Sequence, residues 1–247
     1  MDPVAPRAEL LRLTREEPSE NLALDEALLE SVCAGTRGDT VRLWESPAPF
    51  VVMGISQHIA EEVNESFCAL DGIPVRRRCS AGGCVLQGPG SLNFSLVLGL
   101  HDHPEAQSLH ASYRYILEPL CRAFAARGAM VEIAGLSDLA LARRKVSGNA
   151  QRRKREAILH HGTLLYKPDY EGMARWLAEP AERPAYRGRR RHKAFVGALP
   201  FSREEIEDAV IEAYGAEQES EALPSELDLM RALTASKYEL ETWTRRR

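Results

Sequence analysis

Two periodicities of apolar residues alternate along the chain, and they predict a fold that contains both strands and helices. Over Leu92–Leu98 every second residue is Leu or Phe, which predicts a strand with one buried face. Over residues 20–33 the apolar residues recur at helical spacing, which predicts an amphipathic helix that begins at the capping residue Ser19. A second helix is expected over residues 108–127, ended by Gly128.

The remaining elements follow from short apolar runs bounded by turn residues. We expect further strands at 41–44, 50–53, 73–77, 84–87, 130–133, 138–142, 145–147 and 158–165, and further helices at 169–177, at 203–214 and from Ser225 onward. The first two of these strands are expected to pair as a hairpin, and the strand at 84–87 to pair with Leu92–Leu98 across Gly88-Pro89-Gly90. Strands dominate the middle without regular strand–helix alternation, so we predict an α+β fold with a mixed, largely antiparallel β-sheet flanked by helices.

The composition indicates a single globular domain over residues 1–247. Of the 247 residues, 44% are hydrophobic and 28% are charged. The chain has no apolar run of about 18 residues that would predict a transmembrane helix, and its first residues do not resemble a secretory signal. The five cysteines are odd in number and form no C-x-x-C pair. This pattern argues against a disulfide framework or a structural zinc site and favours a reducing, cytoplasmic setting.

Charge is unevenly distributed, although the net charge is only −4. Seven of the thirteen residues in 143–155 and five of the seven in 187–193 are basic, whereas residues 203–241 carry twelve acidic and three basic residues. Basic clusters attract nucleotide phosphates, an acidic protein partner or nucleic acid, and they also occur as plain solvated loops. Charge alone leaves these interpretations open.

A glycine pair beside an arginine run is the first candidate binding feature. Gly82-Gly83 lies between two predicted strands rather than before a helix, so it is neither a Walker loop nor a dinucleotide fingerprint. It is either a plain hairpin turn or a place where backbone N–H groups meet an anion. Arg76 and Arg78 share one face of an extended strand and Arg77 takes the other, which leaves a guanidinium beside the turn to grip a carboxylate or phosphate.

Three polar positions on later strands are further candidates. Lys145 ends a strand among small residues and is able to reach a ligand as a point charge, although the pattern alone favours a surface lysine in a basic loop. Asn93 either donates to a ligand or satisfies a backbone group. His160 and His161 point to opposite faces of their strand, and a hydrogen-bonding histidine near the site is favoured over a metal ligand because no third ligand lies at diagnostic spacing.

Taken in order, these segments resemble the lipoate–protein ligase family, within the wider biotin/lipoate ligase and octanoyltransferase superfamily. The family patterns are R-R-x-[ST]-G-G-G-A-V-x-H-D-x-G-N and D-L…K-[IV]-[SA]-G-[SN]-A-Q…H-H-G-T-L-L. They are matched here at residues 77–88, 92–95, 138–139, 145–151 and 161–165. The helix with Asn21-x-x-x-Asp25-Glu26 and the final segment 237–243 are also similar, so the resemblance spans essentially the whole chain. It implies the fold of a biotin/lipoate-ligase catalytic domain.

The resemblance implies a two-step reaction, in which lipoate and ATP form lipoyl-adenylate and a lysine of a carrier protein then attacks it. Lys145 would be the catalytic residue and contact both the acyl carbonyl and the phosphate. Arg78 would hold the acyl-phosphate end, backbone from Gly83 to Leu86 would line the nucleotide, and Mg²⁺ would offset the triphosphate charge. The implied binding residues are Arg78, Gly82, Gly83, Cys84, Val85, Leu86, Asn93, Asp138, Lys145, Gly148, His161 and Gly162; no metal ligands are assigned.

The resemblance also implies a lipoyl-carrier domain as partner, from a 2-oxoacid dehydrogenase acyltransferase subunit, the glycine-cleavage H protein or a related carrier. The basic stretch 152–155 would steer an acidic carrier. We expect a monomer that binds neither nucleic acid nor membrane. The chain stops at Arg247, where many ligases continue into an accessory domain. A separate accessory-domain protein would therefore supply that part, or the enzyme would work without it.

Departures from the family pattern keep two alternatives open. Ala81 replaces a glycine, which matters only if that position needs a positive φ, and Gln87-Gly88 replaces His-Asp, so any role of that histidine is lost or passes to the amide. One alternative is an octanoyltransferase, which passes the acyl group through a cysteine thioester. The cysteine of one such group would fall near Met130, but residues 123–165 contain none, and Cys84 is taken as pocket lining. The other is a catalytically inactive lipoyl-binding homologue.

Overall fold

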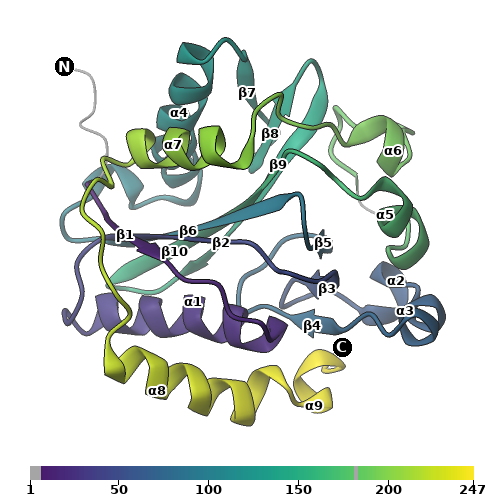
Figure 1. The fold of residues 1–247 in the computed structure, drawn as a ribbon, viewed down its shortest axis with the longest axis horizontal. Helices are drawn as coiled ribbons and strands as arrows, with labels where there is room; N and C mark the ends of the chain where they lie inside the picture. Colours follow the sequence, from purple (N-terminus) through teal and green to yellow (C-terminus); the bar gives the residue numbers. More distant parts are fainter. Residues whose placement is uncertain (1–6, 181–182) are drawn as a thin grey trace.

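A seven-stranded sheet forms the centre of the molecule (Figure 1). The computed structural model describes residues 7–180 and 183–247. The strand order is β1-β2-β6-β10-β9-β8-β7; β1 and β2 are parallel and the other neighbours are antiparallel. These strands are β1 (Glu9–Arg12), β2 (Thr40–Trp44), β6 (Ser91–Gly99), β7 (Val131–Ala134), β8 (Asp138–Leu141), β9 (Arg144–Arg153) and β10 (Ala157–Leu165).

A smaller sheet of three strands lies beside the large one. Its order is β4 (Val75–Arg77), β3 (Phe50–Met53) and β5 (Val85–Gln87), with β3 parallel to β4 and antiparallel to β5. The short helices α2 (Ile59–Glu62), α3 (Glu65–Asp71), α5 (Tyr170–Trp176) and α6 (His192–Phe195) surround this end of the molecule. The two sheets confirm the predicted α+β fold with mixed, largely antiparallel pairing.

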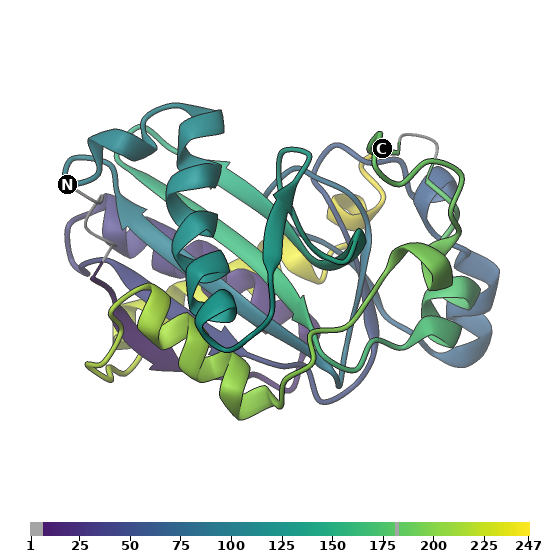
Figure 2. The ribbon, with the colours of Figure 1, turned by 90° about the horizontal axis from the view of Figure 1, so that it is seen from above.

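Long helices cover both faces of the large sheet (Figures 1 and 2). On one face lie α4 (Leu109–Ala126) and α7 (Arg203–Ala213), and on the other lies α1 (Pro18–Cys33), with α8 (Pro224–Leu233) packed against it. The remaining short elements are a 3₁₀ turn η1 (Pro104–Ala106), a π-helical turn η2 (Thr234–Tyr238) and α9 (Glu241–Thr244). Within the described ranges, no helix combines the length and the apolar character needed to cross a membrane.

The alternating pattern of β6 decides which face of the sheet is apolar. Phe94 and Leu96 are fully buried in a core shared with Ile116 and Leu120 of α4, as the periodicity predicts. The opposite side of β6 faces α1, and its residues near the small sheet are polar rather than apolar. A buried polar row needs hydrogen-bond partners or a ligand, so this side of the sheet is where a binding site is expected.

Three local predictions were wrong. β2 and β3 do not form a hairpin, because β2 lies between β1 and β6 while residues 45–49 carry the chain across to the small sheet. β5 pairs with β3 rather than β6, and the turn at Gly88 and Gly90, both with positive φ, leads back to the large sheet. Ser19 does not cap α1, which begins at Pro18; its hydroxyl instead accepts from Arg76 and donates to the Tyr238 carbonyl. Strand patterns do not say which strand pairs with which, and a proline at the first helical turn fixes the helix start.

Candidate active site

Two cavities meet between the large sheet, the small sheet and the glycine turn. The narrow cavity has a volume of about 120 Å³ and lies on the α1 side of the large sheet. The wide cavity has a volume of about 730 Å³ and extends beside β5 toward α5 and α6. Both are lined by Gly82, Gly83, Cys84, Val85, Ser137, Asp138, Lys145, Gly148 and Thr163. The glycine turn and Lys145 therefore stand at the junction.

One row of residues across the sheet forms the floor of the narrow cavity. Trp44 of β2 is opposite Asn93 of β6, Asn93 is opposite Thr163 of β10, and Thr163 is opposite Gly148 of β9. All four line the cavity. Side chains two residues apart on a strand share a face, so Ser95 and His161 form part of the next row of the same floor.

A β-bulge turns Lys145 toward the cavities. Ser147 is opposite Leu139 and Lys145 is opposite Ala140, which leaves Val146 without a partner on β8. The extra residue reverses the alternation, so Val146 packs in the core beneath α4 while Lys145 reaches the face that carries Gly148. Without the bulge, strand periodicity would direct Lys145 to the opposite face.

Lys145 is held by an ion pair and has room because its neighbour is glycine. Its Nζ lies 2.7 Å from Oδ1 of Asp138, and the other carboxylate oxygen accepts a hydrogen bond of 2.7 Å from the Tyr186 hydroxyl. A Cβ on Gly148 would lie 2.7 Å from Nζ. Burial and the charge of Asp138 raise the pKa of Tyr186, so the phenol stays a donor at neutral pH. The pair fixes a cation at the junction of the cavities.

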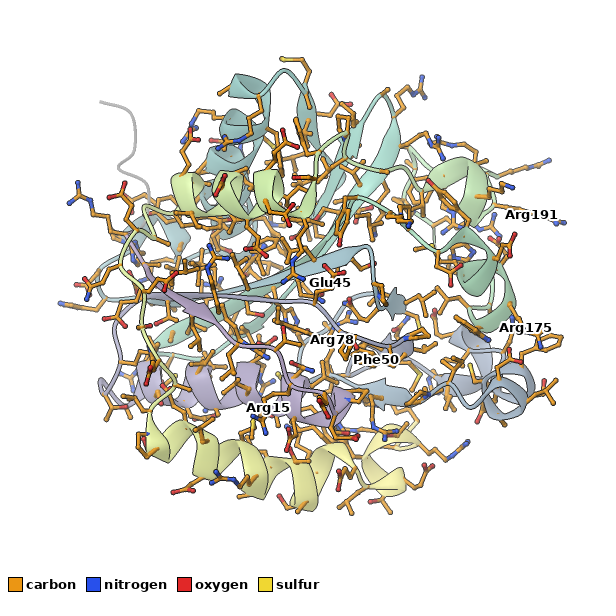
Figure 3. All side chains as sticks on the ribbon, viewed as in Figure 1. Arg15, Glu45, Phe50, Arg78, Arg175 and Arg191 are labelled. Carbon is orange, nitrogen blue, oxygen red and sulfur yellow. The ribbon has the colours of Figure 1, made fainter. Side chains whose placement is uncertain are left out.

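Arg78, labelled in Figure 3, is buried, and it forms no ion pair with a carboxylate of the described residues. Burial lowers its pKa to about 10, so it remains protonated at neutral pH. Its Nε donates to the Ser80 hydroxyl at 3.0 Å, and Nη2 donates to the carbonyls of Ala81 at 2.7 Å and Gly83 at 2.9 Å. In the described parts of the chain, Nη1 makes no such bond. A buried guanidinium with unused donors favours an anionic ligand.

The other two arginines of the run have structural roles. Arg77 is fully buried and donates to the carbonyls of Gly54, Gln57 and Thr244, which ties β4 to the C-terminal segment. Arg76 reaches Ser19 on α1 instead of the cavity. The strand pattern placed Arg76 and Arg78 on one face, but of the three arginines only Arg78 lines the narrow cavity.

A hydrogen-bonded chain connects α1 to Arg78 through His161. Nδ1 of His161 lies 3.3 Å from Oδ2 of Asp25, and Nε2 lies 2.6 Å from Oγ of Ser80, which accepts from Arg78. Burial acts to raise the pKa of Asp25, but hydrogen bonds from His161 and the charge of Arg42 outweigh it and lower that pKa. Asp25 is therefore an anion that orients the ring of His161.

His160 faces the opposite side of β10, as predicted. It is fully buried against Phe94 and Tyr113, and burial lowers its pKa to about 3. It is a neutral core residue hydrogen-bonded to Gln151 and Asn149. Among the described residues, no group of three or more His, Cys, Asp or Glu side chains is placed to hold a metal ion.

Cys84 is the cysteine that lines the cavities within the described ranges. Burial raises the pKa of its thiol to about 12, although the charge of Arg78 acts in the opposite direction. The thiolate is the nucleophilic form of cysteine, so a thiol with this pKa is unreactive at neutral pH. Cys84 is a wall residue rather than an activated nucleophile.

The structure brings together all twelve residues that were expected at the site. Leu86 lines the wide cavity, and the other eleven line the narrow one, seven of them at the junction. The replacement of glycine by Ala81 carries no strain, because the left-handed residue of the turn is Gly82, with φ +94°.

Several residues of the cavity walls were missed. Trp44 stands at one end of the narrow cavity and Tyr186 holds Asp138, but neither carried a signal in the sequence beyond an apolar run or a lone aromatic residue. Arg187 and His192 line the wide cavity. Both residues belong to the basic cluster 187–193, which the sequence shows. The sequence does not show that this cluster lies beside the site.

The basic stretch 152–155 lies at the far end of β9 from Lys145. A strand rises about 3.3 Å per residue, so roughly 26 Å of strand separate Lys145 from Arg153. Arg153 donates to the carbonyls of Ala106 and Gln107, and Lys154 pairs with Glu30, which leaves Arg152 and Arg155 as the exposed members. A role of this stretch in steering a carrier stays a prediction.

Fold and site together define a domain in which a lysine stands where a narrow cavity and a wide one meet. Residues 17–215 match the family model described as the lipoyl protein ligase A/B catalytic domain. The chain therefore belongs to this family.

Individual relatives agree with the family. The chain is 30% identical over 155 residues to lipoate–protein ligase 1 of Staphylococcus aureus, an alignment that covers 63% of this chain and 45% of that protein. The aligned region spans about half the length of the curated relatives, from 43% to 58%.

Solved structures share the fold over almost the whole chain. One is a bi-partite lipoate protein ligase of Thermoplasma acidophilum, described with its E2 lipoyl domain, with a TM-score of 0.84, 24% identity and coverage of 97% of this chain and 96% of that one. Another is a lipoate-protein ligase A bound with ATP, with a TM-score of 0.84, 24% identity and coverage of 97% and 98%.

Proposed function

We propose that this protein is an ATP-dependent lipoate–protein ligase, which activates lipoate as lipoyl-adenylate and transfers the lipoyl group to a lysine of a carrier protein. The observation that carries the proposal is the position of Lys145 at the junction of two cavities of different size, beside a cysteine that is kept protonated. Adenylate formation needs two sites that meet at the reacting carboxylate and α-phosphate, and it needs no protein thiol.

The two cavities suggest separate binding sites for the two substrates. The narrow cavity would take the acyl chain and the wide cavity would take ATP beside the backbone of Gly83 to Leu86, in keeping with the ATP named for one structural relative. Lys145 and the unused Nη1 of Arg78 would stabilise the negative charge that develops between carboxylate and α-phosphate. Since the described residues hold no three-ligand metal cluster, Mg²⁺ would enter on the triphosphate, with few protein ligands.

The acceptor would be a lipoyl-carrier domain, as named for the Thermoplasma acidophilum ligase. Its lysine would attack the adenylate at the junction of the cavities, where the glycine turn is exposed. All five cysteines are free thiols, which supports a reducing, cytoplasmic setting.

The proposal is tested by incubating the protein with lipoate, Mg-ATP and an apo-carrier while measuring carrier mass and pyrophosphate. We expect a lipoyl adduct and pyrophosphate, both dependent on ATP. Transfer of octanoyl from an octanoyl-carrier without ATP, with no ATP-dependent adduct, would show an octanoyltransferase instead.

The variant Cys84→Ser separates these two mechanisms. Because the Cys84 thiol is protonated and only lines the cavities, we expect ligation within about twofold of the unmodified protein. Loss of activity in this variant, together with a thioester trapped on the unmodified protein, would support the transferase. Lipoate binding without any turnover would support the inactive lipoyl-binding homologue.

A further inference from the structure

Two buried polar atoms at the narrow cavity have no hydrogen-bond partner. They are Nε1 of Trp44, a donor, and Oε1 of Gln87, an acceptor, and they are two of the three such side-chain atoms in the described ranges. Trp44 is 3% exposed and Gln87 is 6% exposed, and both line the narrow cavity but not the wide one. Buried polar groups are almost always paired, so an unpaired donor and acceptor in one cavity indicate a ligand that supplies both.

The hydrogen bonds around Gln87 fix which end of its amide is unpaired. The Thr163 hydroxyl has one proton, and it donates this proton to Oδ1 of Asn93 at 3.0 Å. The same hydroxyl accepts from the second neighbour, Nε2 of Gln87, at 2.8 Å. The carbonyl oxygen of Gln87 is therefore the end of the amide that has no partner. This is the position at which a glutamine replaces the histidine of the family pattern.

Trp44 lies at the far end of the cavity from Lys145. The row Trp44, Asn93, Thr163 and Gly148 crosses four adjacent strands, which at roughly 4.8 Å per strand places Trp44 about 14 Å from Gly148. Lys145 Nζ sits against Gly148. An acyl chain of eight carbons with its carboxylate at Lys145 extends over most of this distance, so its far end comes to the neighbourhood of Trp44.

We propose that the narrow cavity selects its acyl chain by the hydrogen-bonding capacity of the far end, with Trp44 and Gln87 as the specificity-determining residues, and that it prefers the reduced, dithiol form of lipoate to the cyclic disulfide and to octanoate. This inference rests on the proposed function. A thiol is a weak donor and a weak acceptor, so a dithiol satisfies both Trp44 and Gln87. The cyclic disulfide satisfies only Trp44, and the octanoyl chain satisfies neither while displacing water from both.

The order of three acids tests the inference. For each acid we would measure kcat/KM for ATP-dependent pyrophosphate release, and Kd without ATP. Dihydrolipoate is measured with a phosphine reductant and lipoate without the reductant. Octanoate is measured both with and without the reductant. We expect dihydrolipoate first, lipoate second and octanoate about tenfold below dihydrolipoate, which corresponds to about 1.4 kcal/mol. The reductant should not change the values for octanoate.

Two variants and one control assign the effect to residues. Gln87→Leu should bring kcat/KM for dihydrolipoate and for lipoate to within about twofold of each other. Trp44→Phe should bring kcat/KM for lipoate and for octanoate to within about twofold of each other. Each variant removes one of the two unpaired atoms. Trp176→Phe removes an indole N–H that is bonded to Asp71 outside the cavity, and it should preserve the order.

The outcomes separate the inference from the proposed function. Equal kcat/KM and equal Kd for the three acids, as expected if water stays bound to both atoms, would overturn the inference while the ligase activity stands. If no acid is turned over, the proposed function fails, and the order of the three Kd values decides the inference alone. If neither Gln87→Leu nor Trp44→Phe changes the order of the three acids, that result also contradicts the inference.

Discussion

At the scale of single residues, the position of the Lys145 side chain depends on Gly148. The side chain of Lys145 crosses the space that a Cβ at position 148 would occupy, and this contact fixes where the cation lies. Asp138 holds the same ammonium by an ion pair. Lys145 therefore has a defined position in the site because Gly148 leaves space for its side chain and Asp138 binds its ammonium group.

Replacing Gly148 by alanine should displace Lys145 without unfolding the protein. The added Cβ would lie 2.7 Å from Nζ, at the end of a flexible side chain that can move away. We expect pyrophosphate release to fall by about tenfold or more, since a misplacement of the order of 1 Å at a reacting centre costs up to about a hundredfold.

The control for this variant is Gly38→Ala, where an added Cβ meets nothing within 4 Å and the site is not involved. Activity and thermal unfolding of both variants should be measured together. Normal turnover by Gly148→Ala at an unchanged melting temperature would show that the position of Lys145 is not critical.

At the scale of elements, the β8–β9 hairpin delivers Lys145 through a strained turn. Ala142 and Arg143 have φ of +48° and +62°, and they are the non-glycine residues with positive φ in the described ranges. Asn-Gly is the usual sequence for a two-residue turn of this kind. Because the left-handed conformation costs about 1–2 kcal/mol in ordinary residues, this chain keeps an unfavourable turn next to its central lysine.

Relieving this strain should stabilise the protein. We expect Ala142→Asn combined with Arg143→Gly to raise the free energy of unfolding in urea by about 1 kcal/mol. Arg122→Gly, an exposed position in the ordinary helix α4, should lower it by about 1 kcal/mol. A loss of stability in the double variant would contradict the account of the turn.

The sequence predicted the elements better than their partners. Helix α4 and strand β6 agree with the prediction, because each has one strongly apolar face that must be buried. The pairing of β3 with β5 was missed, because the same alternating strand fits either sheet. The bulge at Val146 was missed as well, since an unpaired residue has no signature in composition.

The candidate site was predicted through ordered motifs rather than through periodicity. Arg78, Lys145 and His161 are far apart in sequence, and the resemblance to a family placed them together. The sequence could not predict that the Gln87 carbonyl and the Trp44 N–H lack partners. A missing hydrogen bond is visible only when all neighbouring atoms have been placed.

At the scale of the whole molecule, two basic clusters lie at different distances from the site. The cluster 187–193 borders the wide cavity, where Arg187 and His192 line the wall. Arg189 and Arg191 are exposed, and Figure 3 shows Arg191 at the edge of the molecule beside α6. The stretch 152–155 lies at the other end of β9. A carrier must bring its lysine to the junction of the cavities, so the nearer cluster is better placed to guide it.

Charge reversal at the two clusters compares them directly. We expect Arg189→Glu with Arg191→Glu to lower kcat/KM for transfer to an acidic carrier by about tenfold at low salt, with the difference shrinking as salt screens the charges. Arg152→Glu with Arg155→Glu should have the smaller effect, and adenylate formation without carrier should be unchanged in both. A larger effect at 152 and 155 would place the carrier at the far end of the sheet.

The most direct measurement of the central claim is lipoate-dependent pyrophosphate release by Lys145→Ala beside Arg152→Ala, with thermal unfolding of both. If Lys145 is the cation that stabilises the developing charge, Lys145→Ala should lose activity by at least about a hundredfold at a nearly unchanged melting temperature, while Arg152→Ala keeps it. Near-normal pyrophosphate release by Lys145→Ala would remove Lys145 from the mechanism and contradict the account.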